Sequence, residues 1–548
     1  MPRLLTRLLA LAVVAAPLLV AAPVQAESYV PTSGAGSTWS ANAIDQWRRN
    51  VNQYGLKVNY ASTGSSDGRN QFKNGTVDFG VSEIAYGIKD GDTVDEPPTR
   101  AFAYMPIVAG GTAFMYNLKI GGKRVTDLRL SGSSIAGIFT GTITQWNDPK
   151  IKADNPGLVL PARRIVPVVR SDGSGTTAQL TSWMADRHQQ TWDAWCGLVG
   201  RPVPCGTTSN YPVKDGRGFV ALAGSLNVSG YVAQDQSEGA ITYVEYSYAL
   251  NLRFPSAKVL NDGGYYVEPT ASNVAVALLK AKVDENPSSK TYLTPDLRGV
   301  YRNTDPRSYQ LSSYSYMIVP TALSDSFNNE KGKSLGAFAY YFLCQGQQEA
   351  EDLGYSPLPI NLVEAGLKQV RRIPGVAAQD TDIKKCNNPT FSATGENTLA
   401  KNAPQPQACD KQGASQCVGT RAAGGTTTTG TTGGAAAQGT TGGSAAGTTG
   451  GTTTSGTTGS GVAGAPVLPG AVSGVAGPGT VTVDPDTGAV ITDGAVDANG
   501  QQIAAIPVSI GAGGVGSGTA LVLLAIAVLL AVTILPPLLD GRLKRDLT

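Results

Sequence analysis

The sequence predicts an α/β fold in which mainly parallel sheets are flanked by helices. Runs rich in β-branched and aromatic residues, each bounded by glycine or polar residues, recur in the first part of the chain. Longer stretches with the spacing of helices lie between these runs. Strands that alternate with helices in this way usually form parallel sheets covered by helices. The folded region is also too long for one small core, so we expect two lobes.

The expected elements follow one another in a regular order. Strands are predicted at residues 56–63, 76–83, 163–171 and 240–248. Helices are predicted at residues 41–51, 133–139, 177–195, 272–283, 334–354 and 358–373. In sheets of this kind, ligands bind where strand ends meet helix starts.

Residues 1–26 have the pattern of a secretory signal peptide. Arg3 and Arg7 precede an apolar run, and the segment ends at Ala26 in an approximate small-x-small cleavage pattern. The alternative is a signal anchor that is retained in the membrane, and the short apolar run argues against it. We therefore expect the chain to be exported.

Residues 517–539 are predicted to form a transmembrane helix. The run from Thr519 to Leu539 carries no charge and is long enough to cross a bilayer core of roughly 30 Å. Residues 540–548 contain basic side chains, which tend to stay in the cytoplasm. The alternative is a buried helix of a soluble protein. The prediction is a single-pass protein of the cell membrane with its folded domain outside the cytoplasm.

Residues 418–516 consist mainly of Gly, Thr, Ala and Ser. So little apolar surface does not offset the entropy of ordering the chain, so a flexible linker is expected. For roughly 95 residues, flexible-coil statistics give a reach of about 50 to 60 Å. The folded domain is then residues 27–376, followed by a cysteine-containing tail at residues 377–417.

The six cysteines suit an exported protein that forms disulfides. Cys196 with Cys205 and Cys409 with Cys417 are close enough in sequence to close loops, which leaves Cys344 with Cys386. Fifteen pairings are formally possible and the sequence alone does not choose among them. A zinc site is the alternative, but no CxxC pair occurs.

The composition excludes several classes of function. The net charge of +2 is close to balance, and no basic tract occurs outside the C-terminus, so nucleic acid is not an expected partner. His188 is the only histidine. Phosphatase or phosphotransferase chemistry normally needs a metal-bound water or an activated nucleophile, and no cluster for either is visible. We expect no enzyme activity, no metal and no cofactor.

Three turns rich in Gly, Ser and Thr precede predicted helices, at residues 34–47, 62–72 and 170–180. One such turn is more often an ordinary helix cap than a binding element. A helix start exposes unpaired N–H groups and partial positive charge, and small residues let an anion approach them. Three convergent helix starts would supply the many donors that a tetrahedral oxyanion needs.

Two charged side chains near these turns suggest how the anion is selected. Arg170 offers a planar set of donors and a permanent charge, and Asp172 is placed to hold it. Glu83 ends a predicted strand. If it faces the anion, it repels any oxyanion that carries no proton, so phosphate is preferred over sulfate. The alternative for Arg170 is an arginine exposed at the end of a strand. The alternative for Glu83 is a solvated acid at the end of a strand.

The chain resembles the periplasmic phosphate-binding proteins of phosphate-specific ABC transporters. The resemblance covers most of the exported domain, but neither the linker nor the anchor. It is carried by GAGSTW, NYASTGSSDG, TVDFGVSE, IFTGTITQWNDP, RSDGSGTT and GAITYVEYSYA. It implies a two-lobed periplasmic binding protein fold of type II. Lobe 1 is expected at about residues 27–112 and 312–376, and lobe 2 at about residues 113–311.

The resemblance also implies a set of binding residues. The ligand-binding residues carried over by position are Thr38, Trp39, Ser65, Glu83, Arg170, Ser174, Gly175 and Thr176, with Asp172 orienting Arg170 from behind. Two positions depart from the family. Trp39 stands where phenylalanine is usual, and Glu83 stands where the family usually has aspartate, which lengthens the side chain by one methylene.

The expected function is a receptor that binds inorganic phosphate and delivers it to the permease subunits of an ABC-type importer. A monomer is the default expectation for such a receptor. The membrane tether keeps a second hypothesis open, a surface module or sensor that retains the fold without transport. A third hypothesis is a binder of another oxyanion, such as sulfate or molybdate.

Overall fold

The computed structural model describes residues 28–87, 89–90, 93–376, 386, 388–392, 395–417, 482–483 and 490–491. These belong to two units, one within residues 1–429 and the other within residues 430–548. The second unit contributes only β18 (Thr482–Val483) and β19 (Val490–Ile491), which pair as antiparallel strands. All other elements belong to the first unit.

The predicted signal peptide, transmembrane helix and basic tail lie outside the described residues, as does the predicted linker apart from β18 and β19. Among the helices that the structure describes, none combines the length and the apolar character needed to cross a bilayer.

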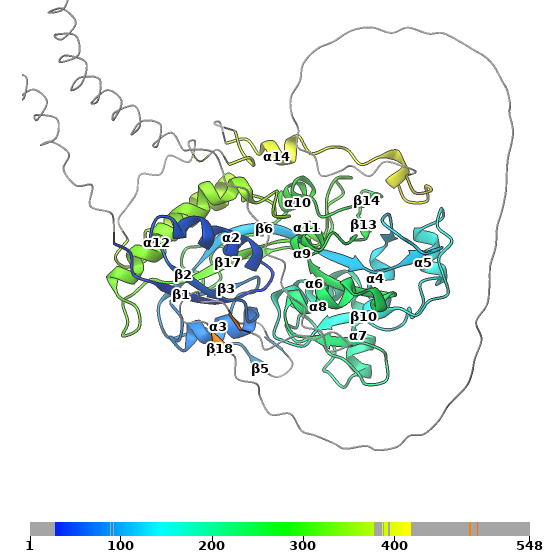
Figure 1. Ribbon diagram of the computed structural model, residues 1–548, viewed down its shortest axis with the longest axis horizontal. Helices are drawn as coiled ribbons and strands as arrows, with labels where there is room; N and C mark the ends of the chain where they lie inside the picture. Colours follow the sequence, from blue (N-terminus) through cyan, green and yellow to red (C-terminus); the bar gives the residue numbers. More distant parts are fainter. Residues whose placement is uncertain are drawn as a thin grey trace, which may run out of the picture. The chain divides into compact units, whose positions relative to one another are not determined.

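One sheet of eight strands runs through the first unit (Figure 1). Its order is β11 (Val220–Leu222), β10 (Val166–Arg170), β12 (Ala240–Glu245), β6 (Phe102–Tyr116), β17 (Ser312–Pro320), β3 (Phe79–Ser82), β1 (Thr32–Gly36) and β2 (Val58–Ala61). The outer strands pair in parallel at both ends. At the centre, β6 and β17 are antiparallel to each other and to β12 and β3. The expected parallel pairing therefore holds at the two ends, while the centre is antiparallel.

The two central strands were not among the predicted ones. After its first residue, β6 is buried along its whole length, and β17 is buried throughout. A strand that is covered on both faces loses the alternation of apolar and polar residues by which half-buried strands are recognised.

Helices lie around this sheet (Figure 1). They are α2 (Ala41–Asn52), α3 (Ser65–Lys73), α4 (Gly132–Phe139), α5 (Pro149–Asp154), α6 (Gly175–Arg187), α7 (Gln189–Leu198), α8 (Ser225–Ala233), α9 (Tyr246–Asn251), α10 (Ala271–Leu278), α11 (Arg298–Tyr301), α12 (Asn329–Leu343), α13 (Ile360–Val370) and α14 (Thr398–Lys401). The helix expected at residues 177–195 is two helices, because the backbone of His188, with φ of −135°, leaves the helical region.

Smaller strands complete the unit. A three-stranded sheet contains β14 (Tyr266–Val267), β13 (Lys258–Leu260) and β9 (Arg129–Leu130). Two-stranded pairs are formed by β4 (Lys89–Asp90) with β5 (Thr93–Val94), β7 (Lys119–Ile120) with β8 (Lys123–Arg124), and β15 (Lys282–Val283) with β16 (Pro295–Asp296).

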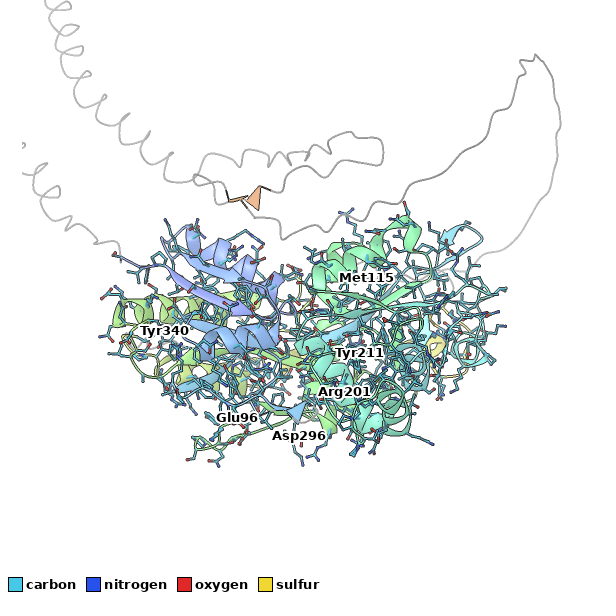
Figure 2. All side chains as sticks on the ribbon, turned by 90° about the horizontal axis from the view of Figure 1, so that it is seen from below. Glu96, Met115, Arg201, Tyr211, Asp296 and Tyr340 are labelled. Carbon is cyan, nitrogen blue, oxygen red and sulfur yellow. A yellow bond between two sulfur atoms is a disulfide. The ribbon has the colours of Figure 1, made fainter. Side chains whose placement is uncertain are left out.

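Two large hydrophobic cores divide the first unit into lobes. The first core gathers buried residues of β1, β2, β3, β17, α12 and α13, and the second gathers those of β9, α4, α6 and α7. Strand β6 contributes Met105 to the first core and Phe114 to the second, so it passes from one lobe to the other. In Figure 2, Tyr340 lies in the lobe of the first core and Tyr211 in the lobe of the second. We call the lobe of the first core the first lobe and the lobe of the second core the second lobe.

All three disulfides that sequence spacing suggested are present. They join Cys196 to Cys205, Cys344 to Cys386 and Cys409 to Cys417. The zinc alternative therefore loses its thiolates, since no cysteine is free.

The described part of segment 386–417 contacts both lobes. Its start is bonded to the end of α12 in the first lobe through the Cys344–Cys386 disulfide. Helix α14 then packs on α10 (Figure 1). Farther along, Asp410 forms ion pairs with the buried guanidinium of Arg129 at 3.2 Å and with Lys258 at 2.8 Å, both in the second lobe. A covalent bond and a pair of ionic contacts thus fasten this segment.

Candidate anion site

The three predicted turns lead into α2, α3 and α6. The residues that precede these helices are Ser40, Gly64 and Ser174. Only Ser174 caps its helix with its side chain, since its hydroxyl accepts the amide of Thr177 at 3.2 Å. The first amides of α2 and α3 have no side-chain cap of this kind, which suits helix starts that face a ligand.

The starts of α3 and α6 meet, although they belong to different lobes. The amide of Gly175 donates to the hydroxyl of Ser65 at 3.1 Å, and the amide of Ser66 donates to the carbonyl of Gly173 at 3.0 Å. A Cβ atom at Gly175 would lie 2.0 Å from Oε2 of Glu83. The chain is therefore without a side chain at the position where the two lobes come closest to this carboxylate.

Glu83 follows β3 and is only 2% exposed. Its Oε1 accepts the hydroxyls of Ser37 at 2.5 Å and Ser315 at 2.8 Å, and its Oε2 accepts the hydroxyl of Ser65 at 2.8 Å. Burial raises the pKa of Glu83 above its ordinary value, and the three hydroxyl groups oppose this rise. Glu83 is therefore buried against the Ser65 turn and is not a solvated acid at the end of a strand.

Arg170 ends β10 and is 2% exposed. Its Nε donates to Asp172 at 2.6 Å, its Nη2 donates to the other carboxylate oxygen, and its Nη1 donates to Ser225 at 3.2 Å. Burial alone would raise the pKa of Asp172, but the hydrogen bonds and charge of Arg170, with the amide of Gly224, lower it below its ordinary value. Asp172 thus holds Arg170 as the sequence predicted.

The first turn reaches the second lobe through Thr38. Its hydroxyl lies 2.7 Å from the hydroxyl of Ser225, and its carbonyl accepts the hydroxyl of Tyr248 at 2.5 Å. Trp39 is buried, and its amide donates to Ser37 at 3.0 Å. The backbone donor that was expected to face an anion is therefore turned toward Ser37.

Thr176 has a buried hydroxyl whose hydrogen-bonding capacity is not used by the described residues. Its side chain is 1% exposed, and its Oγ1 makes no hydrogen bond to the described residues. A buried hydroxyl without a partner costs about 1 to 3 kcal/mol, so such a group in a native site calls for a ligand or a water. This hydroxyl is on the first turn of α6, beside Gly175.

The structure brings the predicted site residues to one place through a continuous series of contacts. Thr38 contacts Ser225, which contacts Arg170 and through it Asp172. Glu83 contacts Ser65, which contacts the start of α6, where Ser174, Gly175 and Thr176 follow one another. Trp39 joins through Ser37 to Glu83.

Sequence reasoning missed Ser37, Ser225 and Ser315. Ser37 lies inside the GAGSTW turn, directly before the predicted binding residue Thr38. Ser225 begins α8 directly after Gly224, whose φ is +77°, so it is a further Gly-Ser helix start that could have been found. Ser315 lies in β17, and nothing in its local sequence marks it.

The groups at this site suit binding and not bond cleavage. Arg170 and the helix starts offer positive potential and donors, and Glu83 offers one acceptor. In the part of the chain that the structure describes, no group of three or more His, Cys, Asp or Glu side chains is placed to hold a metal ion.

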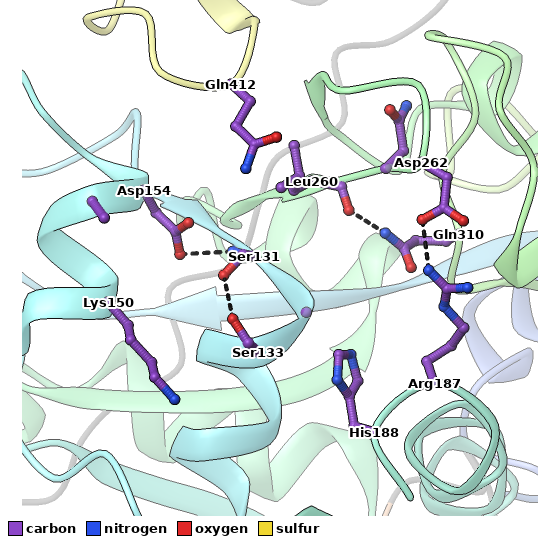
Figure 3. A pocket seen from close by; sticks show the side chains of 13 residues that line it. Ser131, Ser133, Lys150, Asp154, Arg187, His188, Leu260, Asp262, Gln310 and Gln412 are labelled. Atoms are coloured by element: carbon purple, nitrogen blue, oxygen red, sulfur yellow. Dashed lines mark hydrogen bonds and ion pairs between the residues drawn. The ribbon is translucent and has the colours of Figure 1, made fainter.

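A cavity of about 420 Å³ lies elsewhere in the second lobe (Figure 3). It is lined by the start of α4, by Lys150 and Asp154 of α5, by Arg187 and His188, and by Gln412 of the tail. The lining hydrogen bonds are made within the protein, as in the Arg187–Asp262 ion pair at 2.7 Å. None of the predicted site residues lines it, so we assign the anion site to the closed interface between the lobes.

Comparisons with known proteins identify the family of the chain. A model of the PBP superfamily domain matches residues 21–345. The chain is 32% identical over 336 residues to the phosphate-binding protein PstS of Xylella fastidiosa, covering 61% of this chain and 83% of that protein. It is 30% identical over 327 residues to phosphate-binding protein PstS 3 of Mycobacterium tuberculosis, covering 59% and 81%.

Solved structures also align with the chain. The phosphate-binding protein of Stenotrophomonas maltophilia is 16% identical and has a TM-score of 0.42, covering 71% of this chain and 99% of that one. The ancestral soluble variant of the human phosphate binding protein is 19% identical with a TM-score of 0.45, covering 64% and 99%.

Proposed function

The chain belongs to the PBP superfamily and is a relative of the phosphate-binding proteins PstS, and from this premise we propose that it binds inorganic phosphate outside the cytoplasm and delivers it to an ABC-type phosphate importer. Proteins of this family are substrate-binding receptors of transport systems, so the chain is a receptor and not an enzyme. The fold is the two-lobed α/β fold of this family, built on one curled, mixed sheet.

One observation carries the proposal. The starts of α3 and α6, from different lobes, touch at Ser65 and Gly175 beside an acceptor, Glu83. Arg170 brings a buried positive charge to the same interface through Ser225 and Thr38. A small tetrahedral anion needs donors from several directions, and two lobes that close on it supply them.

The proposed binding residues have distinct roles. Arg170 pairs with the charge of the anion, and Asp172 keeps its guanidinium in one orientation. Donors come from Thr38, Ser65, Ser174 and Thr176, while in this structure the amides of Trp39 and Gly175 donate to Ser37 and Ser65. Glu83 accepts a hydrogen bond from the protonated oxygen of hydrogen phosphate. Sulfate carries no such proton at neutral pH, so the same carboxylate repels it.

Isothermal titration of the full-length protein with phosphate and with sulfate, at neutral pH and equal ionic strength, tests this function. We expect one phosphate bound per chain and much weaker sulfate binding. Phosphate that binds no better than sulfate, with both weak, would overturn the proposal. Tight sulfate binding would instead support a receptor for another oxyanion.

We further propose that residues 517–539 anchor the receptor as a single-pass transmembrane helix after export by a signal peptide at residues 1–26. The uncharged run from Thr519 to Leu539 and the basic residues after it support this. Residues 418–516 act as a flexible linker that lets the receptor, as a monomer, reach the permease subunits. Truncation after residue 516 should release the protein from the membrane fraction, and retention of the truncated chain there would disprove the anchor.

A further inference from the structure

The carboxylate of Glu83 is held by three serine hydroxyls from three separate parts of the first lobe. Ser37 follows β1, Ser65 begins α3 and Ser315 lies in β17. Each of the three is at most 1% exposed.

The direction of two of these hydrogen bonds is set by groups on their far side. A serine hydroxyl has one proton and two lone pairs. The oxygen of Ser37 accepts the amide of Trp39 at 3.0 Å, so its proton is left for Glu83. The oxygen of Ser65 accepts the amide of Gly175 at 3.1 Å, so its proton is also left for Glu83.

The hydrogen bond of Ser315 has a hydroxyl, and not an amide, on its far side. The hydroxyls of Ser315 and Ser40 lie 3.0 Å apart. Because Ser315 donates its one proton to Glu83 at 2.8 Å, the proton between the two serines belongs to Ser40. All three hydroxyls are therefore polarised toward Glu83, as they are for an ionised carboxylate that only accepts.

The two oxygens of Glu83 have different surroundings. Oε1 accepts two hydroxyls, from Ser37 and Ser315. Among the described residues, Oε2 accepts the hydroxyl of Ser65 alone, and it is the oxygen that a Cβ at Gly175 would meet at 2.0 Å. Oε1 is thus held within the first lobe, while Oε2 faces the start of α6, where the anion is proposed to bind.

We propose that Ser37 and Ser315 are specificity-determining residues that act through Glu83. They fix Oε1 and keep the carboxylate an acceptor, so that Oε2 meets the anion and admits only an oxyanion that carries a proton. Ser65 turns its proton from Oε2 to the anion as the anion's own proton takes its place. This inference rests on the proposed phosphate-binding function.

Ser37 and Ser315 are needed because burial of Glu83 acts against its ionised form. Burial raises the pKa of Glu83, and the hydrogen bonds of Ser37 and Ser315 oppose that rise. Loss of either hydrogen bond raises the pKa of Glu83 further and so shifts it toward the neutral acid, which can donate a hydrogen bond to sulfate. The discrimination between phosphate and sulfate is then reduced, although neither serine touches the ligand.

The test compares the ratio of phosphate to sulfate affinity among variants of the full-length protein. Ser315→Ala should lower this ratio by about tenfold or more. This factor corresponds to the free energy that a hydrogen bond to a charged group usually contributes. Ser37→Ala should lower it in the same direction. Ser313→Ala is the matched control, because Ser313 lies two residues away in β17 and its side chain makes, within the described part of the chain, one long hydrogen bond of 3.5 Å to the carbonyl of Tyr314.

A pair of isosteric variants covers the case in which Ser315→Ala fails to fold. Ser315→Thr keeps the hydroxyl and should keep the ratio, whereas Ser315→Val has the same shape without the hydroxyl and should lose it. Equal ratios for these two variants would overturn the inference. If the unmodified protein binds no phosphate, the proposed function fails; if it prefers phosphate and Ser315→Ala prefers it equally, only the present inference fails.

Discussion

The amide of Gly175 donates a hydrogen bond of 3.1 Å to the hydroxyl of Ser65, a residue 110 positions earlier in the chain. This contact joins the helix starts of two lobes whose cores are separate. Its closeness depends on the missing side chain at residue 175, since a Cβ atom there would lie 2.0 Å from Glu83 and 2.6 Å from the hydroxyl of Ser65.

Gly175→Ala is therefore expected to hold the lobes apart and weaken phosphate binding. An overpacked contact costs about 1 to 3 kcal/mol, which corresponds to about a 5- to 150-fold loss of affinity. Isothermal titration measures it. Gly230→Ala in α8 is the matched control, because an added Cβ there has no atom within 4 Å. Equal affinities for the two variants would contradict the closed interface.

Arg170→Lys should weaken phosphate binding by about tenfold or more. Lysine keeps the charge but has no planar guanidinium to contact Asp172 and Ser225 at the same time. Arg163→Lys is the control, because Arg163 is 45% exposed and pairs with Glu238 at 3.0 Å, away from the site. If both variants bind phosphate as the unmodified protein does, Arg170 is not a binding residue.

Glu83→Gln should weaken phosphate binding and leave sulfate binding unchanged or stronger. The amide has no charge to repel sulfate, and it no longer offers two acceptor oxygens to the serine hydroxyls and the anion. Competition between the two anions in one titration gives the ratio directly. Glu96→Gln at an exposed position serves as the control for the loss of one charge. A phosphate preference that survives Glu83→Gln would remove Glu83 from the selection of the anion.

His188 should make the protein less stable as the pH falls from about 6.5 to about 4. Burial, with a smaller effect of the charge of Arg187, lowers the pKa of His188 from 6.5 to about 4. The unfolded chain then binds the proton more readily than the folded one, so the free energy of unfolding decreases across this range and changes no further below it.

Urea unfolding over this pH range, compared between the unmodified protein and His188→Gln, isolates this contribution. It is the only histidine in the chain, so its own titration can also be followed by NMR. Two parallel stability curves would show that His188 is not buried as described.

Asp410→Ala should destabilise the second lobe by about 3 to 5 kcal/mol. The substitution leaves the guanidinium of Arg129, which is 1% exposed, without its carboxylate partner. Glu396→Ala in the same tail segment is the control, because its partner Lys401 is 62% exposed and such pairs contribute about 0 to 1 kcal/mol. Chemical denaturation monitors both. Equal small losses would show that the Asp410 contact does not fasten the tail.

Much of the fold follows from local patterns. Strands β2, β3, β10 and β12 and several of the helices were expected near their observed positions, because local residue patterns mark them, whereas β1 and β11 were not predicted. The disulfides were also foreseeable, since Cys196 with Cys205 and Cys409 with Cys417 are separated by only 9 and 8 positions. The central strands β6 and β17 were not, because burial on both faces removes their periodicity.

The contacts of the candidate site also fall into local ones, which the sequence indicates, and distant ones, which it does not. Arg170 and Asp172 are two positions apart, so their pairing could be argued from the sequence. Ser315 contacts Glu83 across 232 positions, and no property of its own segment indicates this. That contact depends on the antiparallel pairing of β17 with β3, which is not a local feature.

By itself the sequence determined the α/β class, the helix starts and the chemical types gathered for an anion, because caps, glycines and periodicity act over a few residues. Only the tertiary structure decided which hydroxyls reach Glu83 and which of its oxygens faces α6. The physical reason is that the pKa of a buried carboxylate depends on the groups within hydrogen-bonding distance of it. The order of strands in the sheet determines which groups these are.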